Sequence, residues 1–312
     1  MQFDFSALAI GPDIAGLYLV ALAVDALFGN APGLRRLFPH PALIMAALIG
    51  GLAAKLNRPE RGMVARLVRG GLVEAVVILL ALAAGYGLEY LTQILPFFWI
   101  VTLFFLVSLT VLRGPFDEAG RVTLGYASGG LKEARLAAAS VIGPTAASLN
   151  ERQLNQALAQ HLAGRFADGL VAGVFWLLIL GLPGFLLWRA INISGRLLDD
   201  SQPEMAVFGL IASRMNEAFG LLPAWLAGII ICVAAIFVPG ASPLKAIAAI
   251  SGSGAGELRH SVRAAVAATA AALGNAGSMT GPDVVRAQYL YAIAGLLVFA
   301  LVVVISALRY AI

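Results

Sequence analysis

Long apolar stretches alternate with shorter polar ones along almost the whole chain. A helix crosses the hydrocarbon core of a bilayer with about 20 consecutive apolar residues, and several stretches approach that length. We therefore predict an all-α, polytopic integral membrane protein with about five to seven transmembrane or re-entrant helices, forming a single membrane domain over residues 1–312. The strong stretches are 14–29, 70–90, 94–112, 168–188, 221–239 and 288–308, and a weaker one is 41–54.

Basic residues bracket the first stretches asymmetrically. None precedes Arg35, several lie between Arg35 and Arg69, and none follows until Arg113. Because Lys and Arg are retained on the cytoplasmic side, we expect the N-terminus and the 91–95 loop outside a bacterial inner membrane, with the working face cytoplasmic. The 41–54 stretch has basic residues at both ends and is short, which favours a re-entrant or interfacial helix. Beyond the fourth stretch the rule does not decide the topology.

Two polar stretches interrupt this pattern, and the first covers residues 113–167. Its amphipathic sequence has helical periodicity, which predicts a cytoplasmic helical hairpin inserted between membrane spans. Ser148 is followed three residues later by Glu151, which is a capping-box signal for the start of the second helix.

The second polar stretch, 240–287, contains a glycine-rich loop that runs into a helix. Gly254 lies in the loop, and Arg259, His260 and Arg263 lie in the first turns expected for the helix. Backbone amides at a helix N-terminus and nearby arginines together bind phosphate well. The glycines match no nucleotide-binding motif, so a flexible loop followed by a solvated basic helix start is the alternative interpretation.

The composition agrees with a membrane location. With 60% hydrophobic and 12% charged residues and a mean hydropathy of +0.89, the chain cannot build a water-soluble surface. The net charge of +4 comes from Lys and Arg scattered between apolar stretches, which fits membrane topology and not nucleic-acid binding. A single cysteine, Cys232, excludes an intrachain disulfide framework. The first stretch lacks signal-peptide features, so we expect it to remain in the mature protein.

The stretch over residues 168–192 has more polar features than an anchor requires. Asp168 opens it, Gly181-Leu182-Pro183-Gly184 interrupts it, and Arg189 and Asn192 lie at its end. A carboxylate at a helix start caps free amides and meets the positive end of the helix dipole. Asp168 is therefore predicted to begin a helix, with metal or phosphate binding as the alternative, and we expect a ligand at the edge of this stretch.

Three other ionisable residues lie in or beside apolar stretches, where charge is costly and usually has a partner or a function. Asp25 is near the inner end of the first stretch, and a functional and a structural role are both open. Glu74 lies one turn inside its stretch, beside Arg69 and Arg66, which predicts a structural ion pair. His40 stands between two prolines that fix its backbone, which favours contact with a polar ligand and not with zinc.

Short motifs follow one another in a definite order. They are Asp25-Ala-Leu-Phe-Gly29, Pro39-His40-Pro41, Ala134-Arg135, Ile142-Gly143, Asp168-Gly169, Phe175-Trp176, Gly181-Leu182-Pro183-Gly184, Ala190-Ile191-Asn192, Phe208-Gly209, Arg214 and Pro223-Ala224. Their order and spacing resemble the CobD/CbiB family of cobalamin biosynthesis, the adenosylcobinamide-phosphate synthases, over roughly residues 17–225.

The resemblance implies an activity and its participants. Such a membrane protein uses ATP and Mg²⁺ to join adenosylcobyric acid to aminopropanol or its phosphate through an amide bond. The corrinoid and the amino-alcohol phosphate are then the substrates, and the protein is embedded in the lipid bilayer. Assembly as a homo-oligomer and binding to partner biosynthetic proteins are both open. No Walker A loop is present, so ATP is implied by the resemblance alone.

The chain also departs from the family pattern at several carboxylates. Where the family usually has two Glu and an Asn before Asp-Gly, this chain has Gln160, Gly164 and Arg165. Ile193 and Gly195 stand where a Thr and an Asp usually follow Ala-Ile-Asn. Phosphoryl transfer needs a divalent metal that oxygen ligands hold, so these losses bear directly on the chemistry.

The remaining residues define a candidate site. Asp168 and Glu217 are the expected catalytic and metal-binding carboxylates, with Asp25 and either Asp199 or Asp200 as further acidic candidates. The expected substrate-binding residues are His40, Asn192, Arg214 and Asp25, and the expected phosphate-binding residues are Arg259, Arg263 and Gly254.

Two other functions stay open beside an amide ligase. The lost carboxylates suggest a membrane paralogue without catalysis that acts as a sensor or assembly partner. The interrupted stretch 168–188 suggests a small-solute transporter, since transporters bind solutes at broken helices. The two halves of the chain show no repeated pattern, which counts against transport.

Overall fold

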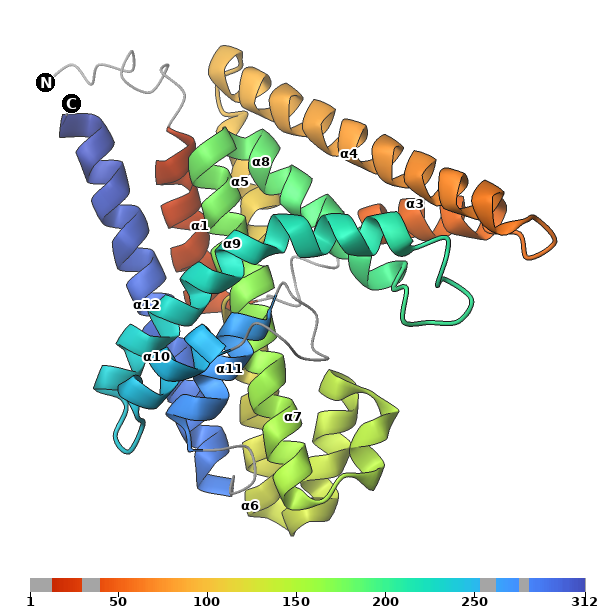
Figure 1. The fold of residues 1–312 in the computed structure, drawn as a ribbon. Coiled ribbons are helices and arrows are strands. Elements are labelled where there is room, and N and C mark those ends of the chain that lie inside the picture. Colours follow the sequence, from red (N-terminus) through yellow and green to blue (C-terminus); the bar gives the residue numbers. More distant parts are fainter. Residues whose placement is uncertain (1–12, 30–39, 253–261, 275–280, 312) are drawn as a thin grey trace, which may run out of the picture. The chain divides into compact units, whose positions relative to one another are not determined.

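The computed structural model describes residues 13–29, 40–252, 262–274 and 281–311, and every regular element in these ranges is a helix (Figure 1). The helices of the first part are α1 (Ile14–Phe28), α3 (Pro41–Leu56), α4 (Met63–Ile94), α5 (Trp99–Leu109), α6 (Arg113–Ile142) and the 3₁₀ turn η2 (Pro144–Ser148). The remaining helices are α7 (Glu151–Gly164), η3 (Arg165–Val171), α8 (Ala172–Leu197), α9 (Leu210–Ala234), η4 (Ala235–Phe237), α10 (Pro243–Gly252), α11 (Arg263–Ala272) and α12 (Gly281–Ala311).

Five helical stretches in the described part of the chain are long and apolar enough to cross a membrane. They are Met63–Ile94, Trp99–Ile142, Glu151–Leu197, Leu210–Phe237 and Val284–Leu308. The helices α1 and α3 are shorter apolar helices. The 16 residues of α3 rise roughly 24 Å, less than the roughly 30 Å of a bilayer core. The predicted all-α, polytopic fold is confirmed.

The chain divides into two compact units. The first unit contains Met1–Thr110, Gly173–Phe219 and Arg309–Ile312, and within it α1 packs on α5 and α3 packs on α4. The second unit contains Val111–Ala172 and Gly220–Leu308, and within it α7 packs on both α6 and α11, and α10 on α11.

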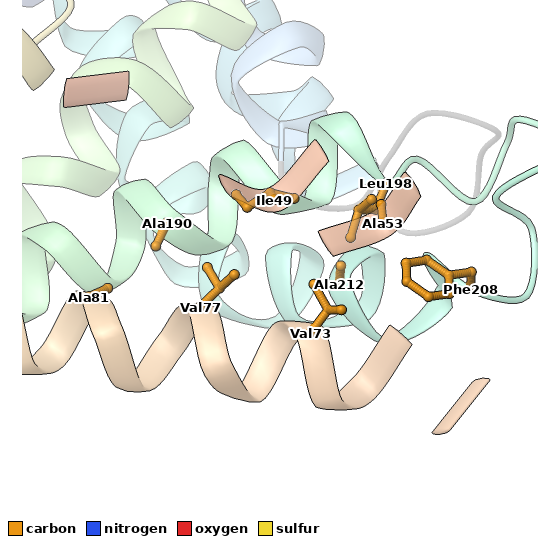
Figure 2. Close-up of a cluster of buried hydrophobic side chains, with 9 residues drawn as sticks. All are labelled: Ile49, Ala53, Val73, Val77, Ala81, Ala190, Leu198, Phe208 and Ala212. Atoms are coloured by element: carbon orange, nitrogen blue, oxygen red, sulfur yellow. The ribbon is translucent and has the colours of Figure 1, made fainter. Parts of the chain in front are cut away.

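An apolar cluster holds four helices of the first unit together. Figure 2 shows it with side chains from α3, α4, α8, α9 and the connection between α8 and α9: Ile49, Ala53, Val73, Val77, Ala81, Ala190, Leu198, Phe208 and Ala212. Four of the nine are alanines, which let helix backbones approach closely, as is usual between membrane helices. Gly70 extends this contact, because a Cβ at that position would collide with the carbonyl oxygen of Phe208.

The expected interruption of α8 is present. Gly181 has φ +69° and ψ −155°, a conformation that glycine adopts without strain, and Pro183 follows two residues later. The Glu89 carboxylate of α4 accepts a hydrogen bond from the Leu182 N–H. Because the break leaves amides without helical acceptors, Glu89 supplies a cap, and the helix resumes beyond it through Leu197.

The predicted helical hairpin over 113–167 is present as α6 and α7, but its details differ from the sequence prediction. The structure bends α6 at Gly129 and Gly130, and the capping box of α7 is Asn150 with Gln153. The prediction that Ser148 caps this helix was wrong. The Ser148 hydroxyl instead donates to the Thr145 carbonyl at 2.9 Å, because Ser148 ends the preceding 3₁₀ turn.

Candidate functional site

Asp168 lies in the middle of an unbroken helical stretch and not at its start. The seven residues Arg165–Val171 form a π-helical turn that continues α7 and leads directly into α8. The prediction that Asp168 opens a helix and caps its amides was therefore wrong, because the preceding turns leave no free amides there. A π-turn within an α-helix frequently marks a functional site, and Asp168 in this turn is partly buried.

Contacts on both sides of Asp168 fix this π-turn within the second unit. A Cβ on Gly169 would lie 3.1 Å from Cβ of Val111, so glycine permits close packing there. The Phe166 ring meets the Tyr291 ring edge-on with centroids 5.9 Å apart. The Tyr291 hydroxyl donates to the Leu112 carbonyl at 2.8 Å. The backbone at Asp168 is consequently held in one position.

The start of α11 lies beside the same turn. A Cβ on Gly164 would be 4.0 Å from Cγ1 of Val262, the residue before α11. Arg263, the first residue of α11, is 8% exposed. The structure thus brings the helix start that carries one predicted phosphate-binding residue close to the turn that carries Asp168. The other two predicted phosphate-binding residues, Gly254 and Arg259, lie outside the described residues.

A cluster of ionisable side chains that was not predicted from the sequence includes residues close to Asp168 along the chain. The His161 Nε2 atom is 2.9 Å from Glu118 Oε2, and both side chains are partly exposed. Arg165 and Arg121 act electrostatically on the same Glu118 carboxylate. His161, Arg165 and Asp168 are spaced four and three residues apart, so helical spacing could have identified their shared face.

The predicted substrate residue Asn192 lies in the first unit and contacts α9. Its Nδ2 donates to Asn216 Oδ1 at 3.2 Å, and both residues are 2% exposed. A Cβ on Gly195 would be 2.5 Å from Cβ of Asn216, so the glycine lets α8 approach α9. The structure therefore joins the Ala190-Ile191-Asn192 motif to the segment that contains Arg214.

Arg214 and Glu217 form an ion pair on α9. The Arg214 Nη1 atom is 2.8 Å from Glu217 Oε2, with the arginine side chain exposed and the glutamate 21% exposed. Both were predicted site residues, and the structure pairs them with each other. Asp168 belongs to the second unit and Glu217 to the first.

Asp25 and His40 were also predicted to bind substrate. Both lie in the first unit, Asp25 on α1 and His40 at the start of α3. Asp25 is 1% exposed near the end of α1, and both it and Arg189 of α8 act electrostatically on the Tyr18 hydroxyl. His40 is the N-cap of α3, where its Nδ1 accepts from the Ala42 N–H at 3.2 Å. An accepting Nδ1 places the ring proton on Nε2.

The predicted ion pair of Glu74 is not formed. The Arg66 guanidinium donates to Asn57 Oδ1 at 2.9 Å and to the Glu204 carbonyl at 2.6 Å. Within the described residues neither Glu74 oxygen has a hydrogen-bond partner, and the residue is 1% exposed on α4.

The described residues contain no group of three or more His, Cys, Asp and Glu side chains that could hold a metal ion. Mg²⁺ needs fewer protein ligands, since it is usually bound by one or two carboxylates together with substrate phosphates. Asp168 fits this requirement as a carboxylate on a fixed turn, whereas Glu217 would have to exchange Arg214 for the metal.

Comparison with known proteins supplies the family. A family model described as CobD/Cbib protein matches residues 18–290. The chain is 30% identical over 229 residues to a cobalamin biosynthesis protein CobD from a Sinorhizobium species, covering 72% of this chain and 70% of the relative. It is 30% identical over 235 residues to the same-named protein of Sinorhizobium fredii, covering 73% and 70%.

A more distant relative extends this likeness to archaea. The probable cobalamin biosynthesis protein CobD of Pyrococcus furiosus is 27% identical over 205 residues, covering 66% of this chain and 68% of the relative. No solved structure matches the chain.

Proposed function

This chain belongs to the CobD/CbiB family of cobalamin biosynthesis proteins, and we propose that it catalyses ATP-dependent amide-bond formation between adenosylcobyric acid and aminopropanol or its phosphate. The product is adenosylcobinamide or its phosphate. The observation that supports this proposal most strongly is Asp168-Gly169 on a fixed π-turn beside the α11 start that carries Arg263.

The chemistry requires activation of a carboxylate, which is a poor electrophile. ATP with Mg²⁺, when bound, supplies that activation by making phosphate the leaving group of the carbonyl. The protein must then neutralise phosphate charge, hold the amine near the carbonyl and exclude water.

Asp168 is assigned to the metal in this proposal. Its backbone is held by packing at Gly169 and Phe166, which keeps the carboxylate in place without the cost of ordering a loop. Arg263 provides a buried cation near the same turn for phosphate oxygens. Arg259 and Gly254 are proposed for the same phosphate on sequence grounds.

Asn192, His40, Asp25 and Arg214 are assigned to the polar groups of the substrates. An asparagine amide and a neutral imidazole both offer donors and acceptors without adding charge to an apolar unit. Asn192 already uses its amide nitrogen on Asn216, so its carbonyl oxygen is the atom proposed to contact substrate. The inner membrane and a cytoplasmic working face are proposed from the early basic residues.

The test uses membranes that contain the full-length protein. They are incubated with adenosylcobyric acid, ATP, Mg²⁺ and aminopropanol phosphate, and the amide product is detected by mass spectrometry. Wild-type membranes should form product that disappears when Mg²⁺ is chelated. Asp168→Asn should lower the rate about a hundredfold or more, the size expected for loss of one electrostatic contact in a transition state.

Asp117→Asn is the matched control. Asp117 is a carboxylate of the same second unit, but it is half-exposed on α6 and pairs with Arg113 at 3.1 Å. This variant should keep wild-type activity, because it removes the same charge outside the proposed site. Full activity in Asp168→Asn would contradict the role given to Asp168.

A non-catalytic membrane paralogue is the second candidate. Two observations favour it. Glu217 is occupied by an ion pair with Arg214. In addition, residues that are acidic or amide in the family are replaced here by Gln160, Gly164 and Arg165. Such a protein would bind the corrinoid with measurable affinity and yield no amide product in the same membranes. Product formation would exclude this candidate.

A further inference from the structure

Glu74 lies inside the apolar contact between α4 and α8, where charged side chains are rare. Its side chain is 1% exposed. Val73 and Val77, the residues one before and three after it, both belong to the cluster in Figure 2. Glu74 therefore shares the face of α4 that is covered by the other helices of the first unit.

Ser194 faces Glu74 from α8. Ala190 of α8 and Leu198, the residue after α8, lie four residues before and after Ser194 and are members of the same cluster, which places Ser194 on the side of α8 that faces it. The Ser194 side chain is fully buried, and its hydroxyl is the polar group that acts on the Glu74 carboxyl.

The hydroxyl hydrogen of Ser194 already has a partner. It is donated to the Ile191 carbonyl at 3.1 Å. A carboxylate is an acceptor only, whereas a carboxylic acid has one O–H to donate. Because neither Glu74 oxygen has a hydrogen-bond partner among the described residues, the ionised form would be left in the apolar contact without a donor.

No charged group compensates Glu74. Burial is the largest influence on its carboxyl, the Ser194 hydroxyl acts in the opposite sense, and no charged group among the described residues contributes. Arg66 is bound to Asn57 and the Glu204 carbonyl, and Arg214 is bound to Glu217. The other cationic residues on the packed helices are Lys55, Arg69, Arg189 and Arg196. A buried carboxylate without a counter-charge is strongly unfavourable, and such groups become neutral instead.

We propose that Glu74 is a membrane-embedded proton-binding site, in which burial among apolar side chains, with no counter-charge, keeps the carboxyl in its acid form with one exchangeable proton. Release of the proton leaves a carboxylate in the apolar cluster, so proton release and separation of α4 from α8 are coupled. The site is independent of the proposed amide ligation, because none of its residues belongs to that site.

Labelling with dicyclohexylcarbodiimide tests the site directly. This apolar reagent reacts with protonated carboxyl groups in membranes, and mass spectrometry of the full-length protein in liposomes locates the adduct. We expect an adduct on Glu74 that is absent in Glu74→Gln. Glu60, which is exposed to water and lies outside the apolar cluster, should stay unlabelled. Once Glu74 ionises, each further pH unit should lower its labelling rate about tenfold.

Infrared difference spectroscopy provides an independent measurement. The carbonyl band of a protonated carboxyl should be present in the wild type and absent in Glu74→Gln. A wild type without this band and without a Glu74 adduct would overturn the proposal. Labelling that sodium ions suppress at constant pH would also overturn it, since the site would then bind a metal cation.

Discussion

At the scale of single residues, small side chains decide where the helices of the first unit can touch. Gly70 and Gly85 of α4 lie where a Cβ would collide with backbone atoms of Phe208 and Pro183. Gly87, only two residues from Gly85, has nothing within 4 Å of a Cβ position. Because both belong to α4, they form a matched pair for testing helix contact.

Gly85→Ala should destabilise the protein, and Gly87→Ala should not. The added methyl at Gly85 must displace the Pro183 backbone, and overpacking of this kind costs about 1–3 kcal/mol. The methyl at Gly87 meets open space and should contribute about 0.5–1 kcal/mol of stability, because alanine loses less backbone entropy in a helix. Thermal unfolding in detergent measures both, and equal midpoints would contradict the close contact of α4 with α8.

The hydrogen bond between Asn192 and Asn216 yields a second residue-scale prediction. Asn192→Ala leaves the buried Asn216 oxygen without this donor and should cost about 1–3 kcal/mol. Adding Asn216→Ala removes the stranded partner, so the double variant should lose less stability than the sum of the two single variants. Strict additivity in unfolding experiments would show that the two amides do not interact.

At the scale of elements, the sequence predicted helices better than their ends. The predicted spans 70–90 and 288–308 lie within observed helices, because apolar runs of that length in lipid must satisfy their backbone hydrogen bonds internally. The predicted span 221–239 runs through α9 and η4 and extends two residues past Phe237. The start of α7 and the position of Asp168 were missed. In both cases a local sequence signal, Ser148 or Asp-Gly, predicted a helix start, but the residues around it form other hydrogen bonds in the structure.

The polar contacts of the candidate site were harder to predict for a different reason. Glu118 and His161 are 43 residues apart in the chain, and Asn192 and Asn216 are 24 apart. Periodicity reports only on neighbours within one helix, so it can place His161 and Arg165 on one face but cannot select the partner on another helix.

The break in α8 is the element whose stability depends on a single interhelical cap. Glu89→Ala removes the acceptor for the Leu182 N–H and should cost about 1 kcal/mol, as loss of a helix cap does. Glu89→Gln keeps an acceptor oxygen and should restore most of the stability. Unfolding of both variants beside exposed Glu60→Ala measures the effect, and an unchanged Glu89→Ala midpoint would contradict the capping role.

At the scale of the whole molecule, the sequence features and the family agree. Five helices of membrane-crossing length, the match over residues 18–290 and relatives named for cobalamin biosynthesis describe a membrane protein of that pathway. The family carboxylates that are missing leave catalysis as the central claim to test. Asp168 is the residue on which that claim depends most.

Complementation tests the claim in the cell. A bacterium that lacks its adenosylcobinamide-phosphate synthase is supplied with cobyric acid, and growth that requires cobalamin is scored with wild type, Asp168→Asn and Asp117→Asn. We predict growth with the wild type and Asp117→Asn and none with Asp168→Asn, with all three proteins inserted and intact. Absence of growth with intact wild-type protein would contradict the ligase and favour the non-catalytic paralogue.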